Sequence, residues 1–352
     1  MTTRMKKIQK KLSEWNVDAL YVSLPRDLFY LTGLSLSKGG LLIAKDRADL
    51  VVDGRYFESC KGKAALHTHL DAKDVLAALL QSVKKIGFDG DAETFSSYGK
   101  LQKLAPQVEW VSLSKPVHEL RIIKDEAELK KIEAACKLCT RGFDYLVSQI
   151  REGITEKELA RALEIFWLQE GGDTIGFEPI IAFGKNSAYP HYRAGSVKLQ
   201  KNELILIDIG VMLDGYHSDM TRVCHFGTVD PRLVEIGLVV QAAQAAAFRA
   251  CKAGVYTSEL DTIAREYIQK AGFGEYFVHG LGHGVGLDIH ELPILKKDPS
   301  IQDVPLQAGM VVTLEPGIYL PGVGGVRIED TVIVQEECAI NLIDLSHQPL
   351  RI

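Results

Sequence analysis

One segment constrains the fold of this chain more than any other. Residues 202–210, NELILIDIG, carry apolar side chains at successive positions and an acid, Asp208, near the end. The side chains at 204–207 would point alternately to the two faces of a strand, so we expect a strand that is buried on both faces. A carboxylate in such a place is unfavourable unless something pairs with it. The segment therefore predicts a central strand whose acid has a binding partner.

A hairpin signal follows this strand. Asp214-Gly215 is typical of a two-residue turn, and a turn there places Thr221 opposite Asp208. Asp219 then lies on the same face and diagonal to Asp208, at about 7–8 Å. The two carboxylates could converge on a pair of cations, which usually lie about 3.5–4 Å apart. Taken alone, the spacing of the two acids fits a cation site and a metal-free alternative equally well. In that alternative one acid is a turn aspartate and the other a surface aspartate.

Two glutamates repeat the pattern. Glu315 ends an apolar strand, Glu329 lies within another, and the sequence PGVGG at 321–325 predicts the turn between them. Arg327 shares the face of Glu329, so a structural salt bridge is the alternative interpretation. A single arginine cannot neutralise four carboxylates, however, and burial of unpaired charges is costly. The four acids together therefore favour a cation site.

The segment VHGLGHGVGLDIHE at 278–291 adds histidines to these acids. His279 and His283 are four residues apart, which on a helix would suggest a zinc pair. The alternating glycines disfavour a helix and suit an extended backbone that approaches something closely. A lone histidine is more often structural, but three in twelve residues favour a site. We predict one metal ligand and separate histidines that face a substrate.

The chain length of 352 residues favours two domains. Strand-like and helical segments alternate up to about residue 115, which predicts a small α/β domain over 1–120. The remainder, 121–352, begins with helical patterns and continues after 176 as strands joined by Gly-rich turns. Predicted helices of this second domain span about 126–150, 155–169, 231–252 and 257–271, the first two with capping boxes.

Composition limits the partners and the compartment. The formal charge is −5 without a basic run, which argues against nucleic-acid binding. No stretch approaches the roughly 18 apolar residues of a membrane span, and the charged start is not typical of a signal peptide. The six cysteines are scattered, and Cys136 and Cys139 lie in a helical pattern that predicts buried thiols rather than a metal or redox pair. We expect a protein of the reducing cytoplasm.

Four motifs in this order and spacing resemble one known family: IDIG followed by SDMTR, then GLGHGVGLDIHE, TLEPGIY and GVRIEDTVIV. They are similar to the proline-specific "pita-bread" metallopeptidases, aminopeptidase P and prolidase. RDLFYLTGL resembles the family's N-terminal domain, and LRIIKDEAEL the start of its catalytic domain. The resemblance implies an α+β protein, with a pita-bread (creatinase/aminopeptidase) catalytic domain after a smaller creatinase-like α/β domain.

The resemblance also implies a two-metal site. Its ligands would be Asp208, Asp219, His283, Glu315 and Glu329, with Asp219 and Glu329 bridging the two ions. An oxygen-rich ligand set suits Mn²⁺ best, with Co²⁺ or Zn²⁺ as alternatives. Four carboxylates balance the charge of two divalent ions, which would activate a water for attack on the scissile carbonyl.

Further roles follow from the same resemblance. Glu315 would pass the water proton to the leaving nitrogen, and His279 and His290 would hold the substrate and stabilise the tetrahedral intermediate. His191 would be a further substrate contact. The remaining residues would support the ligands, namely Arg327, linked to Tyr319 and Asp27, and Thr221. The family also implies a homodimer.

Substrate length is the open point. Prolidases often carry an arginine after their IHE-x-P segment, suited to the free carboxylate of a dipeptide, whereas this chain has Ile294 there. Lys296 and Lys297 could substitute, although lysine is a poorer carboxylate fork. The primary hypothesis is therefore an Xaa-Pro aminopeptidase acting on peptides with proline at the second position. The alternatives are an Xaa-Pro dipeptidase (prolidase), a methionine aminopeptidase-like enzyme and an inactive binding protein of the same fold. A two-metal phosphatase shares the carboxylates but has no counterpart to the histidines.

Overall fold

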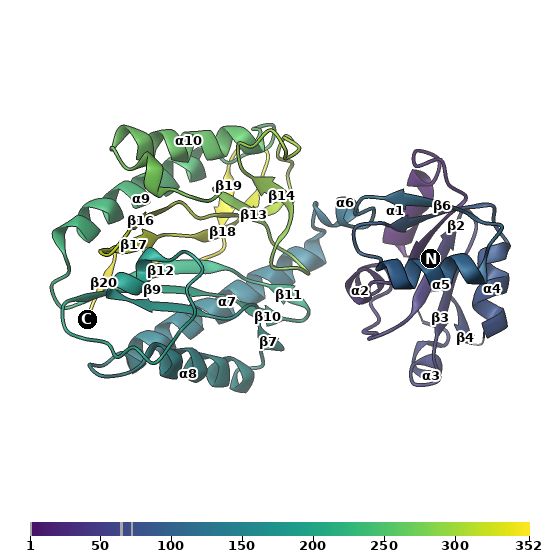
Figure 1. Ribbon diagram of the computed structural model, residues 1–352, viewed down its shortest axis with the longest axis horizontal. Coiled ribbons are helices and arrows are strands. Elements are labelled where there is room, and N and C mark those ends of the chain that lie inside the picture. Colours follow the sequence, from purple (N-terminus) through teal and green to yellow (C-terminus); the bar gives the residue numbers. More distant parts are fainter. Residues whose placement is uncertain (1, 64–65, 72) are drawn as a thin grey trace. The chain divides into compact units, whose positions relative to one another are not determined.

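The computed structural model describes residues 2–63, 66–71 and 73–352. The chain divides into two compact units, Met1–Arg121 and Ile122–Ile352 (Figure 1). Each unit has its own hydrophobic core.

Unit 1 is built around a mixed sheet of six described strands in the order β4-β3-β2-β1-β5-β6. The central strand β1 pairs antiparallel with β2 and parallel with β5. The strands are β1 (Ala19–Val22), β2 (Gly40–Ala44), β3 (Ala48–Val52), β4 (His67–Leu70), β5 (Lys85–Asp89) and β6 (Glu109–Leu113). The helices are α1 (Thr3–Lys11), α2 (Pro25–Thr32), α3 (Phe57–Cys60), α4 (Lys73–Gln81), α5 (Phe95–Leu104) and α6 (His118–Arg121).

Unit 2 places its strands between two layers of helices, one formed by α7 and α8 and the other by α9 and α10 (Figure 1). These helices are α7 (Glu126–Gln149), α8 (Glu156–Gln169), α9 (Pro231–Ala250) and α10 (Thr257–Lys270), with 3₁₀ turns η1 (Gly184–Ala188) and η2 (Gly274–Tyr276). The first strands are β7 (Thr174–Ile175), β8 (Ile180–Phe183), β9 (Glu203–Ile209), β10 (Val211–Leu213), β11 (Tyr216–His217) and β12 (Met220–Phe226). The later strands are β13 (Gly282–Gly284), β14 (Glu291–Leu295), β15 (Val311–Leu314), β16 (Gly317–Leu320), β17 (Gly324–Arg327), β18 (Asp330–Val334), β19 (Ala339–Asn341) and β20 (Leu350–Arg351).

The four predicted helices of unit 2 are confirmed, and so are the two capping boxes. Asp125 caps α7 and Thr155 caps α8, and in each case the third helical residue, Glu128 or Glu158, bonds back to the backbone of the cap. Each box satisfies donors at the helix start that would otherwise lack partners. The capping signals in the sequence therefore locate the start of both helices.

The hairpin predicted at Asp214-Gly215 is confirmed in register. Both turn residues have positive φ angles, 50° and 78°, as a tight turn between twisted strands requires. Leu213 pairs with Tyr216, and further along the ladder Thr221 pairs with Asp208. The turn therefore fixes which residue lies opposite the buried acid.

Helix α9 differs from the sequence expectation. Among the described residues it is the one helix that is long and apolar enough to cross a membrane by length and composition, whereas no such segment was predicted from the sequence. Its apolar side chains at Ile236, Val240 and Ala243 are fully buried in the core of unit 2. In this structure α9 therefore acts as a core helix.

Candidate metal centre and substrate cavity

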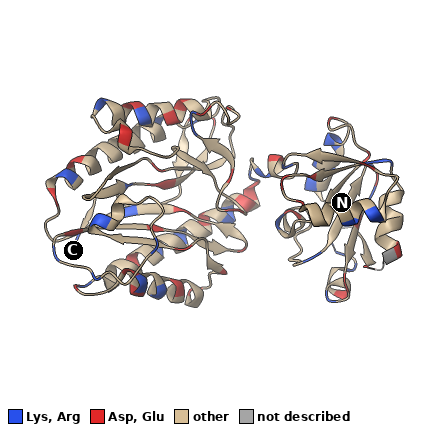
Figure 2. Cartoon of the chain, viewed as in Figure 1, with Lys and Arg blue, Asp and Glu red and all other residues tan. Residues whose placement is uncertain are grey.

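The predicted acidic ligands lie where the strands of unit 2 are interrupted. Asp219 lies between β11 and β12, Glu315 between β15 and β16, and Glu329 between β17 and β18, while Asp208 is near the end of β9. Figure 2 shows acidic positions on these strands, between the two helix layers, as well as on the helices. A break in a ladder frees a side chain from the strict alternation of a strand, so several strands can direct carboxylates to one point.

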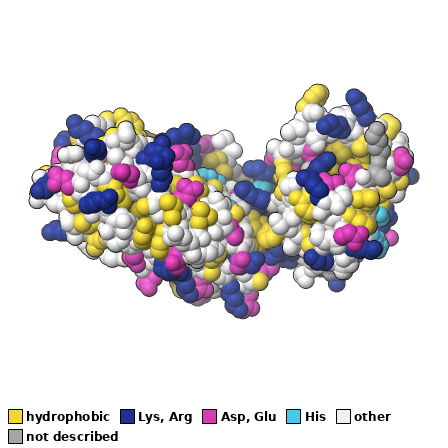
Figure 3. Space-filling model, turned by 90° about the horizontal axis from the view of Figure 1, so that it is seen from below, with side chains coloured by type: hydrophobic (Ala, Val, Ile, Leu, Met, Phe, Trp, Pro, Cys, Tyr) yellow, Lys and Arg dark blue, Asp and Glu magenta, His cyan; other side chains and the backbone are white. Residues whose placement is uncertain are grey.

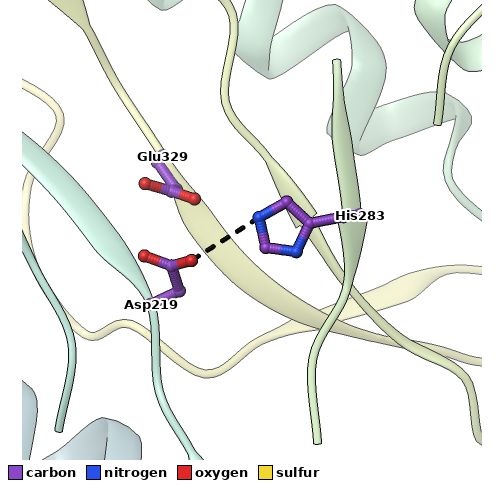
Figure 4. Close-up of side chains that lie close together, drawn as sticks. All are labelled: Asp219, His283 and Glu329. Atoms are coloured by element: carbon purple, nitrogen blue, oxygen red, sulfur yellow. Dashed lines mark ion pairs between the residues drawn. The ribbon is translucent and has the colours of Figure 1, made fainter. Parts of the chain in front are cut away.

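Three ligand atoms meet at that point. One atom each from Asp219, His283 and Glu329 lies within 4.8 Å of the others, and Figure 4 shows the three side chains pointing toward one another. Nε2 of His283 lies 3.6 Å from Oδ2 of Asp219 and 3.4 Å from Oε1 of Glu315. The structure thus brings the predicted histidine and three of the predicted acids together.

The glycines around His283 are required by close backbone contact. A Cβ atom at Gly282 would lie 2.1 Å from the carbonyl oxygen of Thr313, and one at Gly284 would lie 2.2 Å from that of Leu292. No side chain fits at such distances. The predicted extended backbone is confirmed as β13, which lies between β14 and β15.

Burial and mutual repulsion disfavour the charged carboxylates. Burial raises the pKa of Asp219 and Glu329 well above their usual range, and the neighbouring acids raise it further. Burial also raises the pKa of Glu315 to about 8. A group of acids in this state is stabilised by any cation placed among them.

Asp208 contacts a different partner. Its Oδ2 accepts a hydrogen bond from Arg327, while its Oδ1 is buried and has no hydrogen-bond partner. Arg327 also donates to the hydroxyl of Tyr319 at 2.6 Å and to that of Thr221 at 3.1 Å. The Thr221 hydroxyl in turn donates to Oε2 of Glu329 at 2.6 Å. Arg327 therefore orients one acid directly and a second through a threonine.

The tautomer of His283 leaves one of its ring nitrogens available to a metal ion. Its Nδ1 faces the carbonyl oxygen of Gly284 at 3.0 Å, so Nδ1 carries the proton. Burial lowers the pKa of His283 to about 4, which leaves Nε2 as an unprotonated acceptor. That nitrogen lies 3.6 Å from Oδ2 of Asp219 and 3.4 Å from Oε1 of Glu315, so the ring nitrogen and the two acids could bind one cation together. Together with the orphaned oxygen of Asp208, this arrangement fits divalent metal ions.

The other predicted histidines surround the acids. Nδ1 of His279 donates to the carbonyl of Gly280, and its Nε2 lies 2.8 Å from the Tyr319 hydroxyl. Burial lowers the pKa of His279 to about 4 and also lowers that of His290. The exposed ring of His290 packs edge-on against His283, with ring centroids 4.2 Å apart. Both ring nitrogens of His279 thus have partners within the protein, whereas the exposed ring of His290 is open to a substrate.

A cavity of about 530 Å³ opens at this cluster, within the usual range of about 300–1,000 Å³ for small-ligand sites. It brings together all five predicted ligands with His191, His279 and His290. The remaining wall includes the apolar residues Phe177, Ile180, Pro190, Ile289 and Ile294. It also includes the aromatic Tyr192 and the cationic Arg193 and Lys296. The cavity therefore combines acids, histidines and an apolar surface.

Asp27, a further predicted site residue, belongs to unit 1. It lies in α2, where its Oδ1 accepts a hydrogen bond from Arg121 at 3.1 Å. The predicted link from Asp27 to Arg327 would join the two units and stays a prediction.

Sequence reasoning missed the carboxylate that holds the loop around His191. Glu156, at the start of α8, is fully buried and accepts hydrogen bonds from the backbone of Phe183 and Gly195 and from the side chains of Asn186 and Tyr192, at 2.8–3.0 Å. In the sequence it resembles any acid in the first turn of a helix. Only the fold brings the loop donors to it.

A second missed group lies behind Glu329. Arg222 donates to the backbone carbonyl of Glu329 and to the carboxylate of Asp330, both at 2.6 Å. Gln244 and His347 complete the partners of Asp330, at 2.7 and 2.6 Å. The sequence signal was the arginine of SDMTR next to the predicted ligands, but its partner was not identifiable from spacing.

Comparison with known proteins adds independent findings. The model of metallopeptidase family M24 matches residues 130–336, and that of the creatinase/prolidase N-terminal domain matches residues 4–123. An Xaa-Pro dipeptidase of Pyrococcus furiosus is 35% identical over 344 residues, which cover 97% of this chain and 98% of that protein.

Solved structures of Xaa-Pro peptidases are similar to this chain over nearly its whole length. An Xaa-Pro dipeptidase from Bacillus anthracis is similar with a TM-score of 0.95 at 32% identity, over 99% of both chains. An X-Pro aminopeptidase from Thermotoga maritima is similar with a TM-score of 0.90 at 31% identity, over 97% of this chain and all of that one. These findings confirm the predicted resemblance and the predicted fold class, a pita-bread catalytic unit preceded by a smaller α/β unit.

Proposed function

We propose that this chain, which belongs to metallopeptidase family M24, is an Xaa-Pro dipeptidase. Membership of that family makes it a metallopeptidase. The observation that carries this proposal is full-length similarity to a relative of that name, at 35% identity over 97% of the chain. A second Xaa-Pro dipeptidase, from Pyrococcus horikoshii, is 34% identical over 95% of the chain. These relatives favour the prolidase alternative over the aminopeptidase P hypothesis with which the sequence analysis began.

The cavity is consistent with this substrate. A proline ring is an apolar body that packs against side chains such as Phe177 and Ile289. The exposed ring of His290 offers hydrogen bonds at the polar end of the cavity, and His279 lines the same wall. A volume of about 530 Å³ is ample for a dipeptide.

We propose that the five predicted ligands hold two divalent ions, with Mn²⁺ preferred because four of the five donors are carboxylates. When bound, such ions supply a water nucleophile at neutral pH and polarise the scissile carbonyl. Glu315 lines the cavity, and its Oε1 lies 3.4 Å from Nε2 of His283, so this carboxylate is placed among the ligands where it could pass a proton to the leaving nitrogen.

The other residues of the site bind the substrate and orient the metal ligands. Nδ1 of His279 is held by the Gly280 carbonyl, so its Nε2 is the acceptor for the Tyr319 hydroxyl. Arg327 donates to the same hydroxyl and to Asp208. This chain of hydrogen bonds couples the orientation of a substrate-facing histidine to that of a metal ligand.

Metal removal tests the function. The protein is treated with chelator, Mn²⁺ is restored, and cleavage of Ala-Pro, Ala-Pro-Ala and Ala-Ala is followed by product chromatography. We expect cleavage of Ala-Pro only with metal, and little cleavage of the other two peptides. Cleavage of Ala-Ala at a similar rate would refute proline specificity.

The second candidate function is an Xaa-Pro aminopeptidase. Ile294 in place of a carboxylate-binding arginine favours it, as does the similarity to the Thermotoga maritima X-Pro aminopeptidase. Release of alanine from Ala-Pro-Ala in preference to Ala-Pro would establish this function instead.

We further propose a cytoplasmic homodimer. The cysteines at 60, 136, 139, 224 and 251 are buried free thiols, which suits a reducing compartment. Basic and acidic side chains are interspersed on the face drawn in Figure 3, which fits the expectation of no nucleic-acid partner. Sedimentation of the purified protein would test the dimer.

A further inference from the structure

A dipeptide carries a free carboxylate directly beside its proline ring, and this inference rests on the proposed function. A carboxylate in a largely apolar cavity needs a cationic partner. The residue at position 294 is isoleucine, so the partner must come from elsewhere in the cavity wall.

A second candidate position lies close to Ile294, just after β14 ends at Leu295. Ile294 pairs with the ligand His283 across the β13–β14 ladder. Leu295 points to the opposite side and is fully buried. Lys296 directly follows the strand, and it lines the cavity together with Ile294. Two residues along a strand span about 6.6–6.8 Å, a distance that an extended lysine side chain covers.

A glycine makes room for the stem of Lys296. A Cβ atom at Gly280 would lie 3.0 Å from the Cβ of Lys296 and 3.3 Å from its Cγ, so the lysine packs where a side chain at 280 would stand. The backbone beside this contact is fixed, because the amide of Leu281 donates to the carbonyl of Leu295 at 2.9 Å. The start of the lysine side chain is therefore held beside Gly280.

The ammonium group is held but not buried. Nζ of Lys296 lies 3.1 Å from Oδ2 of Asp298, and the lysine side chain is 41% exposed. Asp298 also accepts hydrogen bonds from the backbone amide and hydroxyl of Ser300, at 3.0 and 2.7 Å. Asp298 thus keeps partners when the ammonium turns to a substrate.

Other cations near the cavity are less suited. Lys297 does not line the cavity, and its backbone amide donates to Asp261 at 3.1 Å. Arg193 lines the cavity, but its side chain is 84% exposed and its partner Glu178 lies 3.5 Å away. Lys124 is buried in an ion pair with Glu291 at 2.8 Å.

We propose that Lys296 binds the C-terminal carboxylate of the dipeptide, in the role that an arginine at position 294 would otherwise fill. Specificity for dipeptides then comes from a cation two residues further along the chain, directly after the end of β14. The substrate class that this residue selects is a proline-ended peptide with a free carboxylate.

A pair of substrates that differ only in that carboxylate tests the proposal. Ala-Pro and its amide, Ala-Pro-NH₂, are compared with the Mn²⁺-loaded full chain and with Lys296→Met. We expect kcat/KM for Ala-Pro to fall by about 10–100-fold in the variant, the range of one hydrogen bond to a charged group. Cleavage of the amide should change by less than about twofold. Lys296→Arg should retain the preference for Ala-Pro.

Control variants separate the possible failures. Lys297→Met, at the neighbouring position, should leave both substrates unaffected, and the melting temperature and Mn²⁺ content of Lys296→Met should equal those of the wild type. An equal loss on both substrates, no loss on either, or a selective loss in Arg193→Met instead would overturn the role of Lys296. If the wild-type chain cleaves Ala-Pro-Ala but not Ala-Pro, the proposed function itself fails.

Discussion

Oδ2 of Asp219 lies 3.6 Å from Nε2 of His283, although the aspartate follows a strand of one sheet and the histidine lies in a strand of another. The nitrogen carries no proton, because the other ring nitrogen donates to Gly284. The free nitrogen and the carboxyl oxygen can therefore bind the same cation. The fold of unit 2 brings these two ligand atoms together from different sheets.

Asp219→Asn should abolish this centre. Loss of one charged ligand should weaken Mn²⁺ binding by more than the roughly 10–100-fold that loss of an outer partner costs, and peptidase activity should fall with it. Isothermal titration of the metal-free protein with Mn²⁺ measures the effect. Asp214→Asn is the matched control, because Asp214 is exposed in the turn of the same hairpin and its φ of 50° suits asparagine. Mn²⁺ binding by Asp219→Asn equal to that of the control would contradict the assignment.

The metal-free protein should lose stability as pH rises from 6.5 to 8. Burial raises the pKa of Glu315 from 4.5 to about 8, so its protonated form stabilises the fold fully below pH 4.5 and this contribution is lost as pH rises through 8. His279 and His283 act in the opposite sense. Their pKa values fall from 6.5 to about 4, so their contribution is complete above pH 6.5 and is lost as pH falls through 4. Between pH 6.5 and 8 the histidine contribution is constant while the carboxyl contribution declines.

Thermal unfolding of chelator-treated protein across this pH window measures the effect. The stabilisation gained on adding Mn²⁺ should increase with pH, because deprotonated carboxylates bind metal better. Glu315→Gln should flatten the pH dependence of the metal-free protein. A melting temperature that rises from pH 6.5 to 8 without metal would show that burial does not raise the pKa of Glu315 in this way.

Local signals in the sequence located much of this centre. The two-residue turn at Asp214-Gly215 fixed the register of a hairpin, and Thr221 therefore lies opposite Asp208 as predicted. The glycines around His283 indicated extended backbone, because glycine is poor in helices and permits close approach. Turn chemistry and backbone sterics act over a few residues, so the sequence alone carries them.

Contacts that only the tertiary fold creates were not predictable. The sequence suggested Arg327 as an ion-pair partner of Glu329, but its guanidinium donates to Asp208, which comes from a different hairpin. Lys296 and Lys297 were equivalent in the sequence, and only the structure shows that Lys296 lines the cavity while Lys297 does not. In each case the deciding quantity is a distance between segments far apart in the chain.

Glu156→Gln should loosen the loop that carries His191. An amide at 156 presents a donor group where the carboxylate accepted, so two of the four loop donors lose their acceptor. Each buried unsatisfied group costs about 1–3 kcal/mol. We expect a higher KM for Ala-Pro with less change in kcat, and lower stability. Steady-state kinetics and denaturant unfolding measure the two effects.

Glu158→Gln is the matched control for this loop. Glu158 lies in the same first helical turn, and its contacts belong to the capping box rather than to the loop. Its substitution should leave KM unchanged. If Glu158→Gln raises KM as much as Glu156→Gln does, the effect belongs to the helix start and not to the hydrogen bonds of the loop.

Arg222→Met should destabilise unit 2 and weaken the metal centre together. The side chains of Arg222 and Asp330 are 3% and 0% exposed and lie 2.6 Å apart, so removal of the arginine leaves a buried carboxylate without its main counter-charge. Breaking such a pair costs about 3–5 kcal/mol. Arg222 also donates to the carbonyl of Glu329, so the ligand loses a backbone restraint, and Mn²⁺ affinity should fall as well.

Denaturant unfolding and Mn²⁺ titration distinguish this network from an ordinary ion pair. Lys130→Met provides the comparison, because Lys130 and Glu126 form a pair on the surface of α7 with side chains 71% and 84% exposed. Its loss should change stability by less than about 0.5 kcal/mol. If Arg222→Met is destabilised but binds Mn²⁺ as the wild type does, the network supports the fold alone. If both quantities fall, the backbone restraint on Glu329 is what connects Arg222 to the metal centre.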